Sequence, residues 1–288
     1  METRTQIFAT THATKRGETV DADSLKRVSK QFLDGAGEVD IEHDPRNPPA
    51  GRMVAADFVT LPEGHFGLQG TIQSFDETDY RQPFPLAGVV LRNRGRSTTR
   101  NLVIDEHFYR STEAKSAARE IALELEADVK FLSKNAVEPP TWLIFGLGCG
   151  FGAIASSFLA ELGKDAYKAT KKKLLSLLEK TSSAEKDRLV IFEISLSSAN
   201  NEFLASVILT NPTSEALDSF LKEALPQLDE ITKALAGRSA RVSRVAFSFD
   251  DSKLKLLYVV RKDGLPFIYK GTDIPSSNEP LPGNFDGP

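Results

Sequence analysis

The chain has 288 residues, of which 40% are hydrophobic, enough for two domains with real hydrophobic cores. Its 36 basic and 40 acidic residues give a formal net charge of −4, which argues against a dedicated nucleic-acid-binding protein. The single cysteine, Cys149, excludes an intrachain disulfide and a cysteine-based zinc site.

The first 110 residues predict a β-rich domain built as a small barrel or sandwich. The N-terminus lacks the apolar stretch of a signal peptide, so we expect a cytoplasmic protein. Short hydrophobic runs between Pro and Gly breakers predict strands, and a single helix is expected to begin with Ser24 as its cap. The expected strands cover residues 6–11, 38–42, 53–61, 66–75 and 86–92.

Around His43 the sequence reads VDIEHDPRNPPAGRMVAADF, preceded by KRGETVDADSLKRVSKQF. This pattern over residues 6–92 resembles the N-terminal part of phage prohead (capsid maturation) proteases, in which a strand carrying a histidine leads through a Pro-Gly turn into another strand. The resemblance implies a serine peptidase that uses His43 to activate a serine on a later strand. The corresponding stretch, residues 86–92, has Ala87 and Gly88 but no serine. The alternative is that His-Asp-Pro fixes a turn through a side-chain hydrogen bond.

A basic, polar hairpin is expected after the last of these strands, where it could hold a phosphate or an acidic partner. Its residues are Arg92, Asn93, Arg94, Arg96, Arg100 and Asn101. No metal site is predicted, because the other histidines do not share a metal-ligand spacing. These histidines are His12, His65 and His107.

The middle region, residues 111–181, is predicted to be helical and to begin with a helix over residues 112–132. At its centre, residues 142–160 carry no charge, and a lysine-rich stretch follows. Glycines occupy every second position at the start of this run, at Gly146, Gly148, Gly150 and Gly152. The pattern leaves three interpretations open.

The first interpretation is a helix that enters a membrane or associates with a second copy. A membrane-spanning helix needs about 20 mainly apolar residues, and the following lysines suit an anionic cytoplasmic leaflet. Glycines four residues apart let helices pack closely. The residues expected to make these contacts are Trp142, Phe145, Gly146, Gly150, Lys171, Lys172 and Lys173.

The second interpretation is a nucleotide or cofactor loop between a strand at residues 142–145 and a helix from Ala153. Gly148, Gly150 and Gly152 resemble the first motif of S-adenosylmethionine-dependent methyltransferases. The resemblance implies that their bare backbone lies against the ligand at a helix N-terminus. Such folds also need a second strand that ends in an acidic residue about 20 residues further on, and the expected strands do not supply it.

The third interpretation is a buried helix, or a strand, turn and helix, packed between the two β-rich regions. The glycines would then allow close backbone contact, and the lysines would form an ordinary solvated face. Leucines of the lysine-rich helix would dock it on the core, namely Leu174, Leu175, Leu177 and Leu178.

Residues 187–271 predict a small α+β domain in the order β-β-α-β-β, a four-stranded antiparallel sheet with one helix on a face. The helix has a clear apolar stripe over residues 214–236 and contains Pro226, which should kink it. The strands are expected at residues 188–196, 202–209, 242–249 and 254–260. Residues 272–288 predict a loosely ordered tail rich in Pro, Gly, Ser and Asn.

The sequence therefore indicates an α+β protein that is non-enzymatic, a binding or assembly protein of the cytoplasm. Its expected partner is itself, another protein or an anionic membrane, through peripheral contact or insertion at the inner membrane, and neither a cofactor nor a nucleic acid is expected. The competing class is an enzyme, either a peptidase using His43 or a methyltransferase-like protein using the loop of Gly148, Gly150 and Gly152.

Overall fold

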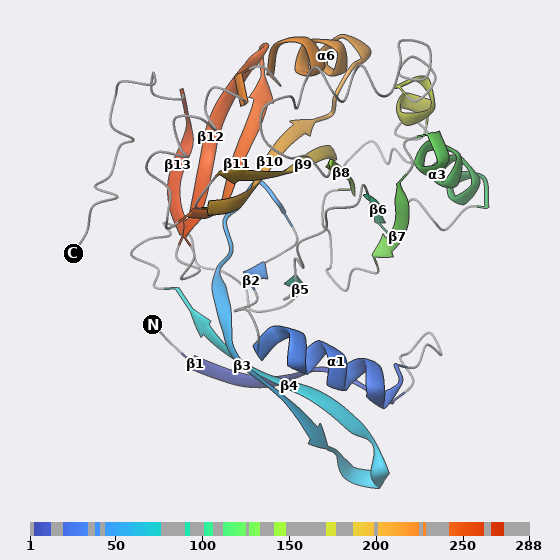
Figure 1. Cartoon of the computed structure of the whole chain (residues 1–288), viewed down its shortest axis with the longest axis vertical. Helices are drawn as coiled ribbons and strands as arrows, with labels where there is room; N and C mark the ends of the chain where they lie inside the picture. The colour runs from blue at the N-terminus through green and yellow to red at the C-terminus, as the bar shows by residue number, and fades with distance from the viewer. Residues whose placement is uncertain are drawn as a thin grey trace.

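The computed structural model in Figure 1 combines helices and strands, so the predicted mixture of α and β structure is confirmed. Its strands form two sheets, one of five strands and one of eight. The structure describes residues 3–12, 20–33, 38–40, 44–75, 90–92, 101–105, 112–124, 127–132, 141–147, 171–176, 187–198, 201–224, 227–228, 242–261 and 266–273.

The five-stranded sheet lies in the N-terminal part of the chain and has the strand order β1-β4-β3-β2-β5. Every neighbouring pair in it is antiparallel. The strands match the five predicted segments, since breakers such as Pro62 and Gly64 separate them. Their bounds are β1 Thr3–Thr10, β2 Glu38–Asp40, β3 Gly51–Thr60, β4 Phe66–Ser74 and β5 Val90–Arg92.

Helix α1 (Ala22–Leu33) packs on one face of this sheet, where Leu25, Met53 and Leu68 form a small core. The predicted cap at Ser24 is wrong by one turn. The Asp21 carboxylate accepts the Ser24 backbone N–H at 2.8 Å, and it also accepts the Ser24 hydroxyl. A carboxylate at this position caps the helix and favours the positive end of its dipole.

The eight-stranded sheet has the strand order β13-β12-β11-β10-β9-β8-β6-β7. Strands of the middle region and of the C-terminal region therefore share one sheet. Strands β6, β7 and β13 have no counterpart among the predicted segments. The bounds are β6 Asn101–Asp105, β7 Asp128–Leu132, β8 Thr141–Leu147, β9 Arg188–Ser198, β10 Asn201–Thr210, β11 Val242–Asp250, β12 Lys253–Arg261 and β13 Pro266–Asp273.

Three strand–helix–strand units build most of this sheet, and each joins two parallel neighbours. They are β6-α3-β7, with α3 at Thr112–Glu124, then β8 and β9 around a helix at residues 171–176, and β10-α6-β11. Helix α6 covers Ser214–Ser219 and continues as a π-helical turn at Phe220–Ala224. The intervening helix returns the chain to the starting edge, which makes each pair parallel.

These units correct two predictions from the sequence. The expected all-antiparallel C-terminal sheet is wrong at β10 and β11, which pair in parallel because α6 connects them. The expected helix over residues 112–132 ends at Glu124, and β7 follows it. Val129 and Phe131 favour a strand, which finds a parallel neighbour in β6.

Apolar side chains are buried on both faces of the eight-stranded sheet. On one face α3, the helix at residues 171–176 and α6 cover the main core, in which the rings of Phe192 and Phe220 stack at 4.4 Å. Alternate residues of the same strands, such as Ile191 and Ile208, form a separate cluster on the second face. Figure 1 shows α3 and α6 beside the large sheet and α1 with the smaller one.

Candidate functional site

The segment of residues 44–50, which leads into β3, reaches from the small sheet to the large one. The Asp44 carboxylate accepts the Arg46 backbone N–H at 3.0 Å, and this hydrogen bond fixes the turn around Pro45. A turn fixed by a side chain of the His-Asp-Pro motif was one of the two predictions for this motif. Asp44 makes the bond, and His43 lies outside the described residues.

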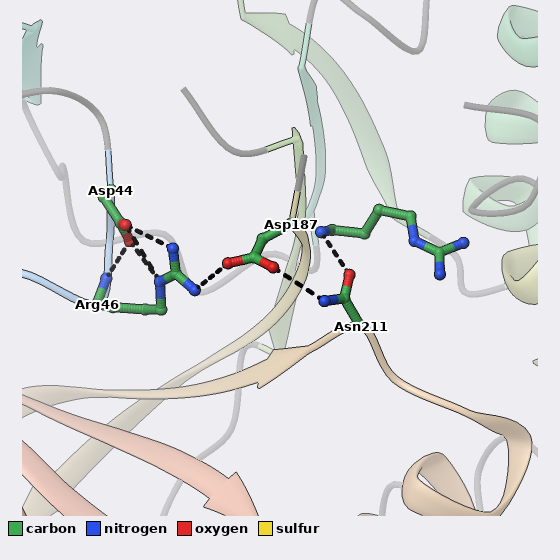
Figure 2. A network of polar contacts seen from close by, with 5 residues as sticks. Asp44, Arg46, Asp187 and Asn211 are labelled. Atoms are coloured by element: carbon green, nitrogen blue, oxygen red, sulfur yellow. Dashed lines mark hydrogen bonds and ion pairs between the residues drawn. The ribbon is translucent and has the colours of Figure 1, made fainter. Parts of the chain in front are cut away.

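The Arg46 guanidinium lies between two carboxylates, as Figure 2 shows. Its Nε donates to the two oxygens of Asp44 at 2.9 and 3.1 Å, and its Nη2 donates to Asp44 Oδ2 at 2.8 Å. Its Nη1 donates to Asp187 Oδ2 at 2.6 Å, across 141 residues of sequence. The turn is thereby bound to the start of β9 by charge-assisted hydrogen bonds.

Asn211 extends this network to the end of β10. Its side-chain Nδ2 donates to Asp187 Oδ1 at 2.9 Å, while its Oδ1 accepts the Arg188 backbone N–H at 2.9 Å. The residue has a positive φ of 48°, which asparagine tolerates better than most residues. Asp187 therefore receives one hydrogen bond on each carboxylate oxygen, from Arg46 and from Asn211 (Figure 2).

The hydrogen bonds of the network favour the charged forms of Arg46 and Asp187. Hydrogen bonds to Asp44 raise the pKa of Arg46, and Asp187 adds to this rise while partial burial opposes it. The hydrogen bond from Arg46 lowers the pKa of Asp187, and the bond from Asn211 acts in the same direction. The arrangement suits a structural junction, because the Asp44 and Asp187 carboxylates are both engaged by Arg46.

A second contact holds the same segment on the large sheet. The hydroxyl of Tyr258, on β12, donates to the carbonyl oxygen of Pro45 at 2.9 Å, and this bond is buried. The Arg244 guanidinium carbon lies 5.3 Å from the centre of the Tyr258 ring. Tyr258 and Arg244 are both buried. We call Asp44, Pro45, Arg46, Asp187, Asn211 and Tyr258 the junction.

Most predicted enzyme and anion-site residues lie outside the described residues. These are His43, Gly148, Gly150, Gly152, Arg94, Arg96 and Arg100. Arg92 is in β5, where its backbone pairs with Glu38 of β2, the strand that leads toward His43. The anion site and the two enzyme hypotheses stay predictions.

The glycine-rich run begins inside the large sheet. Trp142, Phe145 and Gly146 belong to β8, which pairs with β6 on one side and with β9 on the other. Leu143 and Ile144 are buried in clusters on opposite faces. A helix over the whole run is therefore wrong for residues 141–147, where bulky aromatic and aliphatic side chains suit a central strand.

Two of the three lysines predicted to meet a membrane bind carboxylates of neighbouring helices. Lys171 Nζ lies 2.9 Å from Asp218 of α6, and Lys173 Nζ lies 3.2 Å from Glu120 of α3. Lys172 is exposed, and Leu174 is buried in the main core. Among the described residues, no helix has the length and apolar character to cross a membrane.

Four residues of the junction are not among those predicted from the sequence, namely Arg46, Asp187, Asn211 and Tyr258. The Asp-Pro sequence predicts the turn at residues 44–46. It does not predict the bonds of this turn to Asp187 and Tyr258, because these two residues lie far away along the chain. Comparison of the chain with models of protein families, with curated proteins and with solved structures finds no match. The resemblance of residues 6–92 to prohead proteases stays a prediction.

Proposed function

We propose that this chain is a non-enzymatic assembly protein that presents an N-terminal module from the large sheet. The module consists of β1, α1, β3 and β4. The junction is the observation that supports this proposal, because Arg46 and Pro45 bind the large sheet through Asp187 and Tyr258. Two separate bonds to one short turn hold the module in a defined orientation, as a docking surface requires.

The ion pairs of the lysine-rich helix disfavour contact with an anionic membrane. Attraction to an anionic membrane needs basic side chains that face the lipid headgroups. Lys171 and Lys173 instead face Asp218 and Glu120, which offset their charge. The part of the glycine-rich run in β8 has both of its backbone edges paired within the chain. Contacts with a second copy are therefore better supplied by the N-terminal module.

The test is the mass of the full chain in solution, measured by light scattering after size exclusion over a range of concentrations. We expect a mass above that of one chain, rising with concentration. The same preparation is sedimented with vesicles of phosphatidylserine and phosphatidylcholine, and we expect it to stay in the supernatant. A single-chain mass at every concentration would overturn the proposal, and co-sedimentation lost on K171E/K172E/K173E would favour the membrane contact.

A cofactor-binding function is the second candidate, and the parallel pairing of β8 with β9 supports it. Gly148, Gly150 and Gly152 follow the carboxyl end of β8, and the helix at residues 171–176 precedes β9. Glycine-rich loops of nucleotide-binding folds lie at this point of a strand–helix–strand unit. Glu193 of β9 pairs with Gly146 near the carboxyl end of β8, but β9 does not end in an acidic residue, since ISLSS follows. The strand also begins well beyond the spacing of about 20 residues that such folds use, which disfavours this candidate.

Calorimetry with S-adenosylmethionine tests this candidate directly. If the loop binds the cofactor, titration gives a measurable heat of binding that Gly150→Val abolishes, because a branched side chain blocks the close approach of the backbone. The thermal unfolding midpoint of Gly150→Val serves as the control for folding. If the wild-type protein gives no heat of binding, S-adenosylmethionine binding by this loop is excluded.

A further inference from the structure

Strand β1 is the outer strand of the small sheet. It pairs with β4 on one side, and no described strand pairs with its other side. Thr3, Arg4, Thr5 and Ile7 of this strand are exposed. In a strand with one neighbour, half of the backbone N–H and C=O groups project away from the sheet, where they can pair with another chain.

The regular part of β1 is symmetric about Thr5. Continuous pairing with β4 runs from Thr3, opposite Gln73, to Ile7, opposite Gln69, and the irregularity of the strand begins only after Ile7. Thr5 is the middle residue of this stretch. An antiparallel partner centred on Thr5 would therefore pair along the regular backbone and leave the irregular part of both strands outside the contact.

We infer that two copies of the chain associate by antiparallel pairing of their β1 strands, centred on Thr5. In this register Thr5 faces its counterpart, Ile7 faces Thr3, and Arg4 faces Gln6. No two like charges stand directly opposite, and the threonine pair is favourable across antiparallel strands. The proposed partner is a second copy because β1, paired with itself in this register, places each Arg4 opposite a neutral Gln6 and no two like charges directly opposite each other.

The geometry of the module is compatible with such a dimer. The two-fold axis of an antiparallel strand pair is perpendicular to the sheet, so the two α1 helices lie on the same face. The opposite face carries polar side chains such as Thr5 and Thr71, whose hydroxyl oxygens lie 3.1 Å apart. Pairing also covers Ile7, which is 39% exposed in the single chain. Backbone hydrogen bonds supply the affinity in this mode of recognition.

The inference rests on the proposed assembly function, and a charge exchange at Thr5 tests it. Thr5→Glu places two carboxylates opposite each other, and Thr5→Lys places two ammonium groups there. We expect each variant alone to weaken the dimer by a factor of about two to five. An equimolar mixture of the two variants should restore it, because opposite charges then face each other. Sedimentation velocity of the full chain measures all three samples.

Thr60→Glu and Thr60→Lys are the matched controls, since Thr60 is exposed at the end of β3 and away from the β1 edge. They should leave the dimer unchanged. A wild-type protein that remains a single chain would contradict the proposed function itself. If the wild-type protein dimerises and both Thr5 variants dimerise equally well, only the β1 interface is overturned. A dimer that is weaker in both variants and does not recover in the mixture would overturn the register centred on Thr5.

Discussion

The two sheets of this protein bury their side chains in different ways. The eight-stranded sheet buries apolar side chains on both faces, under α3 and α6 on one side and in further clusters on the other. The five-stranded sheet has a small core under α1, while strands β1 and β4 carry half-buried or exposed polar side chains on the other face. We therefore expect the large sheet to contribute most of the stability of the fold.

The largest loss of stability is expected from Phe220→Ala. Phe220 is fully buried, stacks on Phe192 and meets the edge of Phe249 at 5.6 Å. Removing its ring should lower the free energy of unfolding by about 3–5 kcal/mol. Urea denaturation followed by circular dichroism measures this value. The exposed Lys222 of the same helical segment is the control, since Lys222→Ala should change it by less than about 0.5 kcal/mol.

A smaller and local effect is expected from Leu25→Ala in the small sheet. Leu25 belongs to a core with few members, and its truncation should cost about 2–3 kcal/mol. Amide hydrogen exchange should become faster in β3 and β4 and stay unchanged in β9 and β10. Lys30→Ala, on an exposed position of α1, is the control. If amide exchange became equally faster in both sheets, the sheets would unfold as one unit. This result would contradict the expectation that the small sheet depends on its own core.

Tyr258→Phe tests the neutral contact of the junction. It removes the hydroxyl that binds the Pro45 carbonyl and leaves that buried oxygen without its donor. We expect a loss of about 1–2 kcal/mol, with faster exchange confined to the segment that leads into β3. An unchanged unfolding free energy and unchanged exchange would contradict the role of this bond.

The charged contact should contribute less, because Arg46 and Asp187 are both partly exposed. A double-mutant cycle with Arg46→Gln and Asp187→Asn should give a coupling energy of about 1 kcal/mol in urea denaturation. The same cycle for Lys171 and Asp218, a pair between two helices of the large sheet, is the matched comparison. A coupling energy near zero would contradict the claim that the ion pair of Arg46 and Asp187 stabilises the junction.

Acid should weaken the charged contact. The pKa of Asp187 is lower in the folded protein than in the unfolded chain, because Arg46 and Asn211 bind its carboxylate. Its contribution to stability is therefore fully present above the unfolded pKa of about 3.9 and is lost as the pH falls through the folded value. The stability difference between wild type and Asp187→Asn should shrink below about pH 4. A difference that grows on acidification would contradict this assignment.

Local features of this fold could be predicted from the sequence, and its pairings could not. Strands β3 and β4 follow from short hydrophobic runs bounded by Pro62 and Gly64. The parallel pairing of β10 with β11 depends on where α6 returns the chain, which the alternation of side chains does not specify. The Asp44 turn follows from the Asp-Pro sequence, whereas its bond to Asp187 spans 141 residues.

We infer that the chain assembles through the edge of β1 with which no described strand pairs. The most direct test is amide hydrogen exchange of the wild-type protein at low and at high concentration. We expect the amides of residues 3–7 to exchange more slowly at high concentration, while those of β7, the outer strand at one edge of the large sheet, keep their rate. Unchanged exchange in β1, at a concentration where the mass has doubled, would contradict the account.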